Sequence, residues 1–360
     1  MSVEKNLEEV KNGQRISFNG YAVDHKDDKF HEFTHTRHAL GEKDILIDIY
    51  YAGICHSDIH SVRSEWHEGI YPMVPGHEIS GKVIAVGDKV TKFKVGDLAG
   101  VGCMVNSCGE CDACKSSHEQ FCERDQAVLT YDCHDCFHDN EPTYGGYSNN
   151  IVVSEDFAVN VPDDAPLEVV APLLCAGITT YSPLMFSKVK KGDKVGVAGF
   201  GGLGVMAVKY ALLLGAEVHV FARNEKKKKE AMDLGVTALH TSVKDAPKGF
   251  DFILSTIPTS YDINEYLELL KYGGEMAIIG LPPADVKLSV DATRLVFDAG
   301  KKVYGSLIGG IKETQEMLDY SLKHKVYPEI EVIDPTDIDK AYENLTTGKA
   351  KFRYVIDMKK

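Results

Sequence analysis

The sequence predicts a two-domain α/β protein, in which a β-rich, barrel-like domain is followed by a doubly wound parallel sheet. Short strand-like segments separated by Gly-Asp turns fill the first part of the chain, as in a barrel-like β domain. After about Pro162, strand-like and helical segments alternate, which favours a parallel sheet with helices packed on it. The length of 360 residues also fits two domains.

The individual segments follow from hydrophobic periodicity and turn residues. In the β-rich part, the expected strands are 44–51 and 79–86, with turns at Gly87-Asp88 and Gly96-Asp97. In the second part, the expected strands are 194–198, 217–222, 237–240, 251–255, 275–279 and 302–304, and the expected helices include 203–214 and 225–234. The tail contains an expected helix at 312–324 and a last strand at 354–358. We therefore expect residues 1–164 and 309–360 to form the first domain and residues 165–308 the second.

Composition narrows the class of protein and its compartment. Hydrophobic residues make up 44% and charged residues 26%, as in ordinary soluble proteins, and the net charge of −14 argues against binding to nucleic acid or anionic membranes. The first fifteen residues are polar and lack the apolar stretch of a secretory signal, and no run has the length of a membrane-spanning helix. Nine cysteines in a chain without a secretory signal indicate a reducing compartment, where thiols bind metals more often than they form disulfides. We therefore expect a cytoplasmic protein.

Four cysteines form a compact C-x2-C-x2-C-x7-C run at Cys108, Cys111, Cys114 and Cys122. Four thiolates at this spacing can surround one zinc ion tetrahedrally, and a closed shell of this kind stabilises a loop and does no chemistry. An iron–sulfur ligand set is the main alternative, but its common spacing ends in x3 and a proline. Disulfides are a weaker alternative. We expect a structural zinc lobe near residues 103–125.

A glycine-rich turn, Gly199-Phe-Gly201-Gly-Leu-Gly204, follows an apolar strand and opens an apolar helix. In that context the G-x-G-x-x-G pattern predicts a dinucleotide site, because Gly199 makes the tight turn and Gly201 lets backbone amides approach a pyrophosphate. Gly204 lets helix and strand pack closely, and the helix N-terminus attracts phosphate. The alternative is a plain glycine turn between a strand and a helix.

The end of the next strand favours NADP(H) over NAD(H). An NAD site carries Asp or Glu there for the ribose 2′-hydroxyl, whereas this strand ends in Ala222-Arg223-Asn224 with lysines close behind. The guanidinium of Arg223 has a planar fork that suits a 2′-phosphate. The alternative is that the basic run 225–230 is simply a solvated helix face.

A second set of metal ligands is dispersed along the chain. Cys55, His77 and Cys175 each carry little weight alone, since an isolated cysteine is more often a core residue. Together they supply two sulfurs and one imidazole, and three protein ligands with an exchangeable fourth position are the composition of a catalytic zinc site. Asp58 could accept the free N–H of His77 and fix its tautomer.

These motifs, in order, resemble those of the zinc-dependent medium-chain alcohol dehydrogenases, and within them the cinnamyl alcohol dehydrogenases. The resemblance runs from about Gly20 to Lys359 and rests on the segments 53–60, 75–78, 145–148, 171–177, 199–204 and 305–310 and on the four-cysteine lobe. It implies a GroES-like β-barrel catalytic domain and a Rossmann nucleotide domain. It also implies two zinc ions per chain, NADP(H) and a homodimer.

The resemblance further implies a role for each site residue. Cys55, His77 and Cys175 hold the catalytic zinc, Glu78 is a transient ligand or a carboxylate beside the ion, and Ser57 and His60 relay a proton. Trp66, the one tryptophan, lines the substrate pocket, with ordinary core as the alternative. The implied cofactor contacts are Thr180, Gly199, Gly201, Gly202, Leu203, Gly204, Arg223, Asn224, Lys227, Ser306 and Arg353.

The expected reaction is the interconversion of primary alcohols and aldehydes, with cinnamaldehyde- and benzaldehyde-like substrates. A polyol or formaldehyde-type dehydrogenase that uses NAD is one alternative, and a non-catalytic, nucleotide-binding redox sensor is another. The C-x2-C pair Cys133 and Cys136, flanked by two histidines, departs from the two-zinc pattern and is interpreted as a surface or pocket-edge loop. A third metal ion would change that interpretation.

Overall fold

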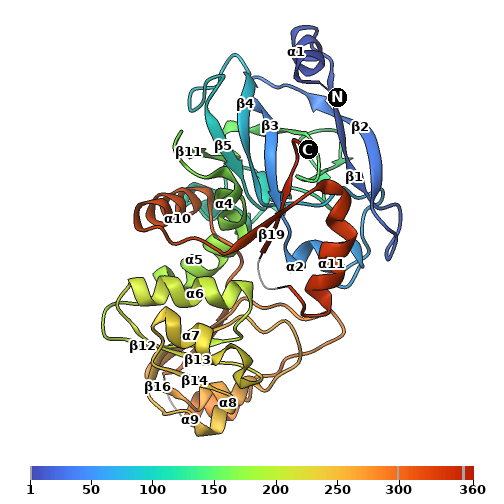
Figure 1. Ribbon diagram of the computed structural model, residues 1–360. Coiled ribbons are helices and arrows are strands. Elements are labelled where there is room, and N and C mark those ends of the chain that lie inside the picture. The colour runs from blue at the N-terminus through green and yellow to red at the C-terminus, as the bar shows by residue number, and fades with distance from the viewer. Residues whose placement is uncertain (1, 298–299, 351–352) are drawn as a thin grey trace. The chain divides into compact units, whose positions relative to one another are not determined.

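The computed structural model describes residues 2–297, 300–350 and 353–360. These residues form two compact units (Figure 1). Unit 1 runs to Cys175 and resumes at Gly309, and unit 2 is Ala176–Ile308. The boundary expected from the sequence after residue 164 therefore lies ahead of the division at Cys175, whereas the expected return at residue 309 coincides with the start of the second part of unit 1.

Unit 1 is built around β3 (Asp44–Gly53), a ten-residue strand rich in isoleucine and almost wholly buried. It pairs with β4, β10 and β19 in a seven-stranded sheet of order β11-β5-β4-β3-β19-β18, with β10 beside β3. The other strands of this sheet are β4 (Ile79–Val86), β5 (Leu98–Val101), β10 (Asn150–Ser154), β11 (Ala158–Val161), β18 (Ile330–Ile333) and β19 (Arg353–Asp357). Both expected strands of the first part and the expected last strand are present.

Smaller elements complete unit 1. An antiparallel pair, β1 (Arg15–Ala22) with β2 (His31–Ala39), lies beside the sheet. The long connection after β5 contains two short strand pairs, β6-β7 and β8-β9, and the short helix α3. The short strands are β6 (Met104–Asn106), β7 (Val128–Leu129), β8 (His134–Asp135) and β9 (Glu141–Pro142). The helices are α1 (Val3–Lys11), α2 (His56–Val62), α3 (Asp112–Lys115), α4 (Leu167–Pro172), α10 (Ile311–His324) and α11 (Ile338–Thr346).

Unit 2 contains a six-stranded parallel sheet of order β14-β13-β12-β15-β16-β17, the doubly wound order that the sequence predicts. The strands are β12 (Lys194–Ala198), β13 (Glu217–Phe221), β14 (Ala238–His240), β15 (Phe250–Ser255), β16 (Leu270–Ile278) and β17 (Lys302–Gly305). The helices are α5 (Ile178–Phe186), α6 (Gly202–Leu213), α7 (Lys228–Leu234), α8 (Ile263–Leu267) and α9 (Ala292–Phe297). All six expected strands are confirmed, each within a few residues of its expected ends.

One helical stretch, Leu167–Phe186, is long and apolar enough to cross a membrane by length and composition. Its most apolar window is 72% buried within the protein, as in the core helix of a globular fold. The stretch joins α4 to α5 through a π-helical turn at Leu173–Gly177, and this turn contains Cys175. A π-helical turn inside an α-helix often lies at a functional site, because the extra residue re-aims the side chains around it.

The close approach of β12 and α6 depends on glycine, and Gly204→Ala should destabilise unit 2. A Cβ at position 204 would lie 2.1 Å from the carbonyl oxygen of Gly199, so one of the two elements would have to move. Overpacking of this kind costs about 1–3 kcal/mol, which urea unfolding measures. The matched control is Gly201→Ala, since a Cβ there meets no heavy atom within 4 Å. Equal losses in the two variants would contradict this account.

Candidate active site

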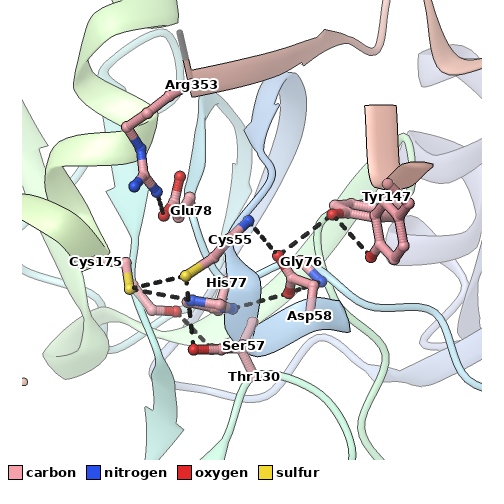
Figure 2. Close-up of polar contacts among 12 residues, drawn as sticks. Cys55, Ser57, Asp58, Gly76, His77, Glu78, Thr130, Tyr147, Cys175 and Arg353 are labelled. Carbon is pink, nitrogen blue, oxygen red and sulfur yellow. Dashed lines mark hydrogen bonds and ion pairs between the residues drawn. The ribbon is translucent and has the colours of Figure 1, made fainter. Parts of the chain in front are cut away.

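Two sulfurs, an imidazole and a carboxylate converge in the interior of unit 1 (Figure 2). Ligand atoms of Cys55, His77, Glu78 and Cys175 all lie within 4.8 Å of one another, and all four residues are buried. The sulfur of Cys175 lies 3.9 Å from the sulfur of Cys55 and 3.2 Å from Nε2 of His77. Two sulfurs and one nitrogen at this spacing fit a tetrahedral zinc ion with one position left for another ligand.

Local structure aims these ligands. Cys55 is the N-cap of α2, and its backbone N–H donates to Oδ2 of Asp58 at 2.8 Å, so the first turn of the helix fixes the direction of the thiol. Oδ1 of Asp58 accepts from Nδ1 of His77 at 3.0 Å and from the amide of Gly76 at 3.2 Å. The first of these bonds sets the tautomer of His77, so that Nε2 presents its lone pair to the cluster.

Burial and charge set the protonation of the cluster. A hydrogen bond from the Cys175 thiol holds the pKa of Cys55 well below its ordinary value, and the interactions of Cys175 with Cys103 and then with Cys55, together with burial, raise the pKa of Cys175. Burial lowers the pKa of His77, but the Asp58 carboxylate outweighs it and holds that pKa well above the ordinary range. The protons are therefore shared within the cluster until a cation displaces them, because metal binding requires thiolates and a neutral imidazole.

The carboxylate of Glu78 is the fourth ligand group of the cluster. One of its carboxylate oxygens pairs with Nη2 of Arg353, while the other, Oε2, is buried without a hydrogen-bond partner. Burial raises the pKa of Glu78 to about 8, and the charge of Arg353 opposes the shift. A Cβ at Gly53 would lie 1.9 Å from Oε2, so only glycine on β3 leaves room for this carboxylate.

Arg353 thus lies in unit 1 at the start of β19, against Glu78, with its side chain 11% exposed. The resemblance implied that it contacts cofactor phosphates. Its Nη2 donates to Glu78, and its Nε is buried without a partner, so the guanidinium keeps one donor for a further ligand.

The expected relay residues lie on α2. The Ser57 hydroxyl is 3.6 Å from the sulfur of Cys55. His60, one helical turn on, pairs through Nδ1 with the carboxylate of Glu65 and stacks on Trp66 at a ring distance of 4.8 Å. Since Nδ1 donates to Glu65, the neutral ring of His60 keeps a lone pair on Nε2 to accept a proton. Glu65 had not been singled out in the sequence.

The four-cysteine lobe forms a second, separate cluster. Sulfurs of Cys108, Cys111, Cys114 and Cys122 lie within 4.8 Å of one another. Backbone N–H groups of Cys111 and Cys114 donate to sulfurs at 3.4 and 3.5 Å, which stabilises thiolates. Backbone N–H groups also lower the pKa of Cys122, against burial, to about 6. Four sulfurs with no further ligand position fit a structural zinc ion.

In unit 2, the glycine turn forms an open cradle at the start of α6. Gly199 has φ +95°, a left-handed conformation that favours glycine, and Gly201 is the N-cap of α6 without a side-chain cap. A Cβ at position 201 would meet nothing within 4 Å, so the backbone there is accessible to a ligand. The uncapped amides and the dipole of this twelve-residue helix suit a pyrophosphate.

The remaining expected cofactor residues lie around this turn or elsewhere in unit 2. Arg223 is exposed just after β13, and Lys227 lies 5.8 Å from the ring of Phe200 in the glycine turn. Asn224 accepts the amide of Lys226 and so caps the next helical turn. The hydroxyl of Thr180 is fully buried and donates to Ala176 O at 2.7 Å. Ser306 follows β17 and donates its amide to Ile278 O at 3.0 Å.

Two residues beside Cys55, His77 and Cys175 are not among those that the sequence predicts for the site. The interaction with the Cys175 thiol lowers the pKa of Cys103, so this thiol lies close to the cluster. The hydroxyl of Tyr147, fully buried, lies 3.3 Å from Oδ2 of Asp58 and donates to it. The glycine pair that precedes Tyr147 was among the recognised segments, but no spacing rule indicates that its side chain reaches Asp58.

Comparisons with known proteins agree with this geometry. Residues 41–163 match the alcohol dehydrogenase GroES-like domain, and residues 202–323 match the zinc-binding dehydrogenase family. The chain is 46% identical to probable formaldehyde dehydrogenase AdhA of Bacillus subtilis, over 94% of this chain and 96% of that protein. It is 44% identical to cinnamyl alcohol dehydrogenase 8 of Arabidopsis thaliana, over 91% of each.

A solved structure is also similar over nearly its whole length. The crystal structure of CAD from Helicobacter pylori complexed with NADP(H) is 62% identical, with a TM-score of 0.93, over 96% of this chain and 99% of that one. A GroES-like unit with an open zinc site and a doubly wound nucleotide unit define a zinc-dependent dehydrogenase. The chain belongs to the zinc-dependent medium-chain alcohol dehydrogenases, in the cinnamyl alcohol dehydrogenase family, which confirms the family and the fold that the sequence predicts.

The two cysteine clusters should respond differently to substitution. Cys108→Ser removes one of four structural ligands, so it should release one zinc equivalent and cost more than about 3 kcal/mol of stability. Cys175→Ser should leave the unfolding midpoint nearly unchanged and lower turnover at least a thousandfold, because Lewis-acid polarisation supplies several kcal/mol of catalysis. Zinc content by elemental analysis, thermal unfolding and aldehyde turnover measure the three effects. Loss of stability in Cys175→Ser equal to that in Cys108→Ser would contradict the assignment.

Proposed function

We propose that this protein is an NADP(H)-dependent, zinc-dependent alcohol dehydrogenase that reduces aldehydes to primary alcohols, with cinnamaldehyde- and benzaldehyde-like substrates preferred. The observation that carries the proposal is the convergence of Cys55, His77 and Cys175, which are buried and within bonding reach of one ion, in a cluster whose one further ligand group among the described residues is the Glu78 carboxylate. Such a site leaves a position for a substrate oxygen, which the four-sulfur lobe does not.

Residues of unit 1 would hold the metal and the proton path. When bound, zinc supplies a Lewis acid for the carbonyl oxygen, and the nicotinamide supplies the hydride. Cys55, His77 and Cys175 hold the ion, and Asp58 keeps His77 in the tautomer that binds it. Glu78, with one unpartnered carboxylate oxygen, can exchange with the outside ligand as that ligand leaves.

The alkoxide product needs a proton, and α2 offers two groups that could deliver it. Ser57 lies near the sulfur of Cys55, where its hydroxyl can contact the substrate oxygen. His60 can pass the proton on, since Glu65 holds its Nδ1 and leaves Nε2 free. An imidazole suits this step because its ordinary pKa is close to neutral.

The choice of NADP(H) rests on unit 2. Arg223 is exposed at the end of β13 with no carboxylate beside it, so a 2′-phosphate would meet a guanidinium there. The similar CAD from Helicobacter pylori was crystallised with NADP(H), which supports the same choice. The exposed glycine turn at 199–204 would receive the pyrophosphate.

The substrate class rests on Trp66 and on the relatives. The indole stacks on His60, the proposed relay residue, so a flat aldehyde bound at the zinc site could also lie against it. The Arabidopsis relative is named for cinnamyl alcohol, whereas the Bacillus relative is named as a probable formaldehyde dehydrogenase. Formaldehyde is therefore the second candidate substrate. A redox sensor without activity is disfavoured by the complete ligand set.

We also propose a cytoplasmic homodimer. All nine cysteines are free of disulfides, which suits a reducing compartment. β17 is at one end of the sheet in the described part of unit 2, so its outer edge is available for pairing with a second copy. Large apolar side chains are exposed in the same unit, namely Phe186, Tyr272, Leu281, Val296, Phe297 and Leu307.

The activity is tested directly by mixing the zinc-loaded protein with NADPH and cinnamaldehyde, benzaldehyde or formaldehyde. We expect NADPH consumption with the aromatic aldehydes at a higher kcat/KM than with formaldehyde, and loss of turnover after treatment with a strong chelator. Cys175→Ser is the control for any activity that does not use the metal. No turnover across the three aldehydes would sink the enzyme proposal, and a preference for formaldehyde would favour the second candidate.

Coenzyme preference is tested separately by the ratio of kcat/KM for NADPH and NADH. We expect the ratio to favour NADPH and Arg223→Ala to reduce kcat/KM for NADPH about tenfold or more, because a charge-assisted hydrogen bond contributes about 1.5–3 kcal/mol. Values with NADH should change little. Lys229→Ala is the matched control, since Lys229 is exposed on the following helix and pairs with Asp233 at 2.5 Å. A ratio that favours NADH in the unmodified protein would refute the NADP(H) proposal.

A further inference from the structure

A third group of possible metal ligands lies in unit 1, apart from both cysteine clusters. It consists of His38 near the end of β2, Asp44 at the start of β3 and His138 in the loop between β8 and β9. One nitrogen of each ring and one carboxylate oxygen of Asp44 lie within 4.8 Å of one another. The fold alone brings these three segments together, because His38 and His138 are far apart in the sequence.

The two imidazoles are sheltered, and the Nδ1 atom of each is hydrogen-bonded. The side chains of His38, Asp44 and His138 are only 17%, 11% and 28% exposed. Nδ1 of His38 donates to Ala39 O at 3.0 Å, and Nδ1 of His138 donates to Oδ2 of Asp135 at 2.7 Å. In its neutral form, each ring therefore has its proton on Nδ1 and a free lone pair on Nε2.

The buried carboxylate of Asp135 places a negative charge beside the group, which favours binding of a cation. Asp135 is 5% exposed, and its other oxygen accepts the amide of Phe137 at 2.9 Å, so this carboxylate is held in place beside His138. A cavity of about 30 Å³ adjoins the group on the side of His38, and its lining includes the carboxylate residues Asp135 and Glu141 and also the cationic Arg37. That volume is enough for one water molecule or one small ion.

We propose that His38, Asp44 and His138 bind a divalent transition-metal ion, with Asp135 as the carboxylate that orients His138. Two imidazoles and a carboxylate suit zinc, nickel or copper and give a ligand set of nitrogen and oxygen, unlike the sulfur-rich clusters of the same unit. A fourth position on the ion can be filled by water. The ion would join the end of β2, the start of β3 and the 134–142 hairpin.

Binding needs one local rearrangement. The rings of His38 and His138 are parallel, with centroids 3.6 Å apart and 6° between their planes. Since a metal lies in the plane of each imidazole that binds it, one ring must turn about χ2, a broad torsion with no deep staggered wells.

The charged side chains near the group already have partners within the protein. Glu141 is paired with Arg15 at 2.5 Å, and the buried guanidinium of Arg37 donates to Tyr144 O and to the Ser148 hydroxyl. The C-x2-C pair on the same hairpin does not take part: among the described residues, Cys133 and Cys136 belong to no group of converging ligands. His134, also on this hairpin, instead pairs through Nδ1 with Asn140 O at 2.9 Å.

The test counts metal in the zinc-loaded enzyme after dialysis against excess Zn²⁺ and removal of free ion. We expect one zinc equivalent beyond those of the two cysteine clusters. His138→Gln and His38→Gln should each lose that equivalent while retaining the others and aldehyde turnover, which also reports that the variants fold. Asp135→Asn should weaken binding of the extra equivalent about tenfold or more in a calorimetric titration with Zn²⁺, as expected when the carboxylate behind a ligating histidine is removed.

His134→Gln is the matched control, because it removes a histidine from the same hairpin but not from the group, and it should retain the extra equivalent. Three results would overturn the proposal. They are the absence of an extra equivalent in the unmodified enzyme, its retention by both His38→Gln and His138→Gln, and its loss in His134→Gln.

Discussion

The arrangement of the ligand cluster in unit 1 depends on one buried carboxylate. Asp58 is fully buried, and its two oxygens accept from the amides of Cys55 and Gly76, from Nδ1 of His77 and from the Tyr147 hydroxyl. These partners join the start of α2, the loop before β4 and the segment before β10. A buried charge is costly unless hydrogen bonds satisfy it. The carboxylate of Asp58 therefore needs the donors of all three segments, and its hydrogen bonds keep these segments together. The positions of Cys55 and His77, two of the proposed zinc ligands, follow from this one side chain.

The two cysteine clusters differ in the number of ligands that the protein supplies. This number decides whether a metal site only stabilises the fold or can also bind a substrate. In the lobe, four sulfurs come from a short stretch of chain, and backbone amides stabilise them, so the metal site is a property of local sequence. In the catalytic cluster, ligands such as His77 and Cys175 are 98 positions apart, and only the packed domain brings them together. A closed local site can therefore support a loop, while the open site needs the whole unit around it.

The same difference explains how much the sequence predicts. Strands of the parallel sheet, the glycine turn and the cysteine lobe are local patterns, and their positions agree with the structure because periodicity and short spacing are enough to define them. No short spacing joins Cys55, His77 and Cys175, so their residue types only suggested a catalytic zinc set, and the family resemblance assigned each its role. The pairing of Glu78 with Arg353, of His60 with Glu65 and of His38 with His138 could not be foreseen, because each depends on how distant strands or loops pack.

The return of the chain into unit 1 has a consequence for synthesis. Unit 2 is one continuous segment, but unit 1 lacks α10, α11, β18 and β19 until the last fifty or so residues are made. β19 pairs with β3, and its first residue, Arg353, pairs with Glu78 across 275 positions of sequence. On the ribosome, unit 2 can therefore fold while unit 1 is still incomplete, and the catalytic metal site acquires its final electrostatic environment only after the end of the chain has emerged.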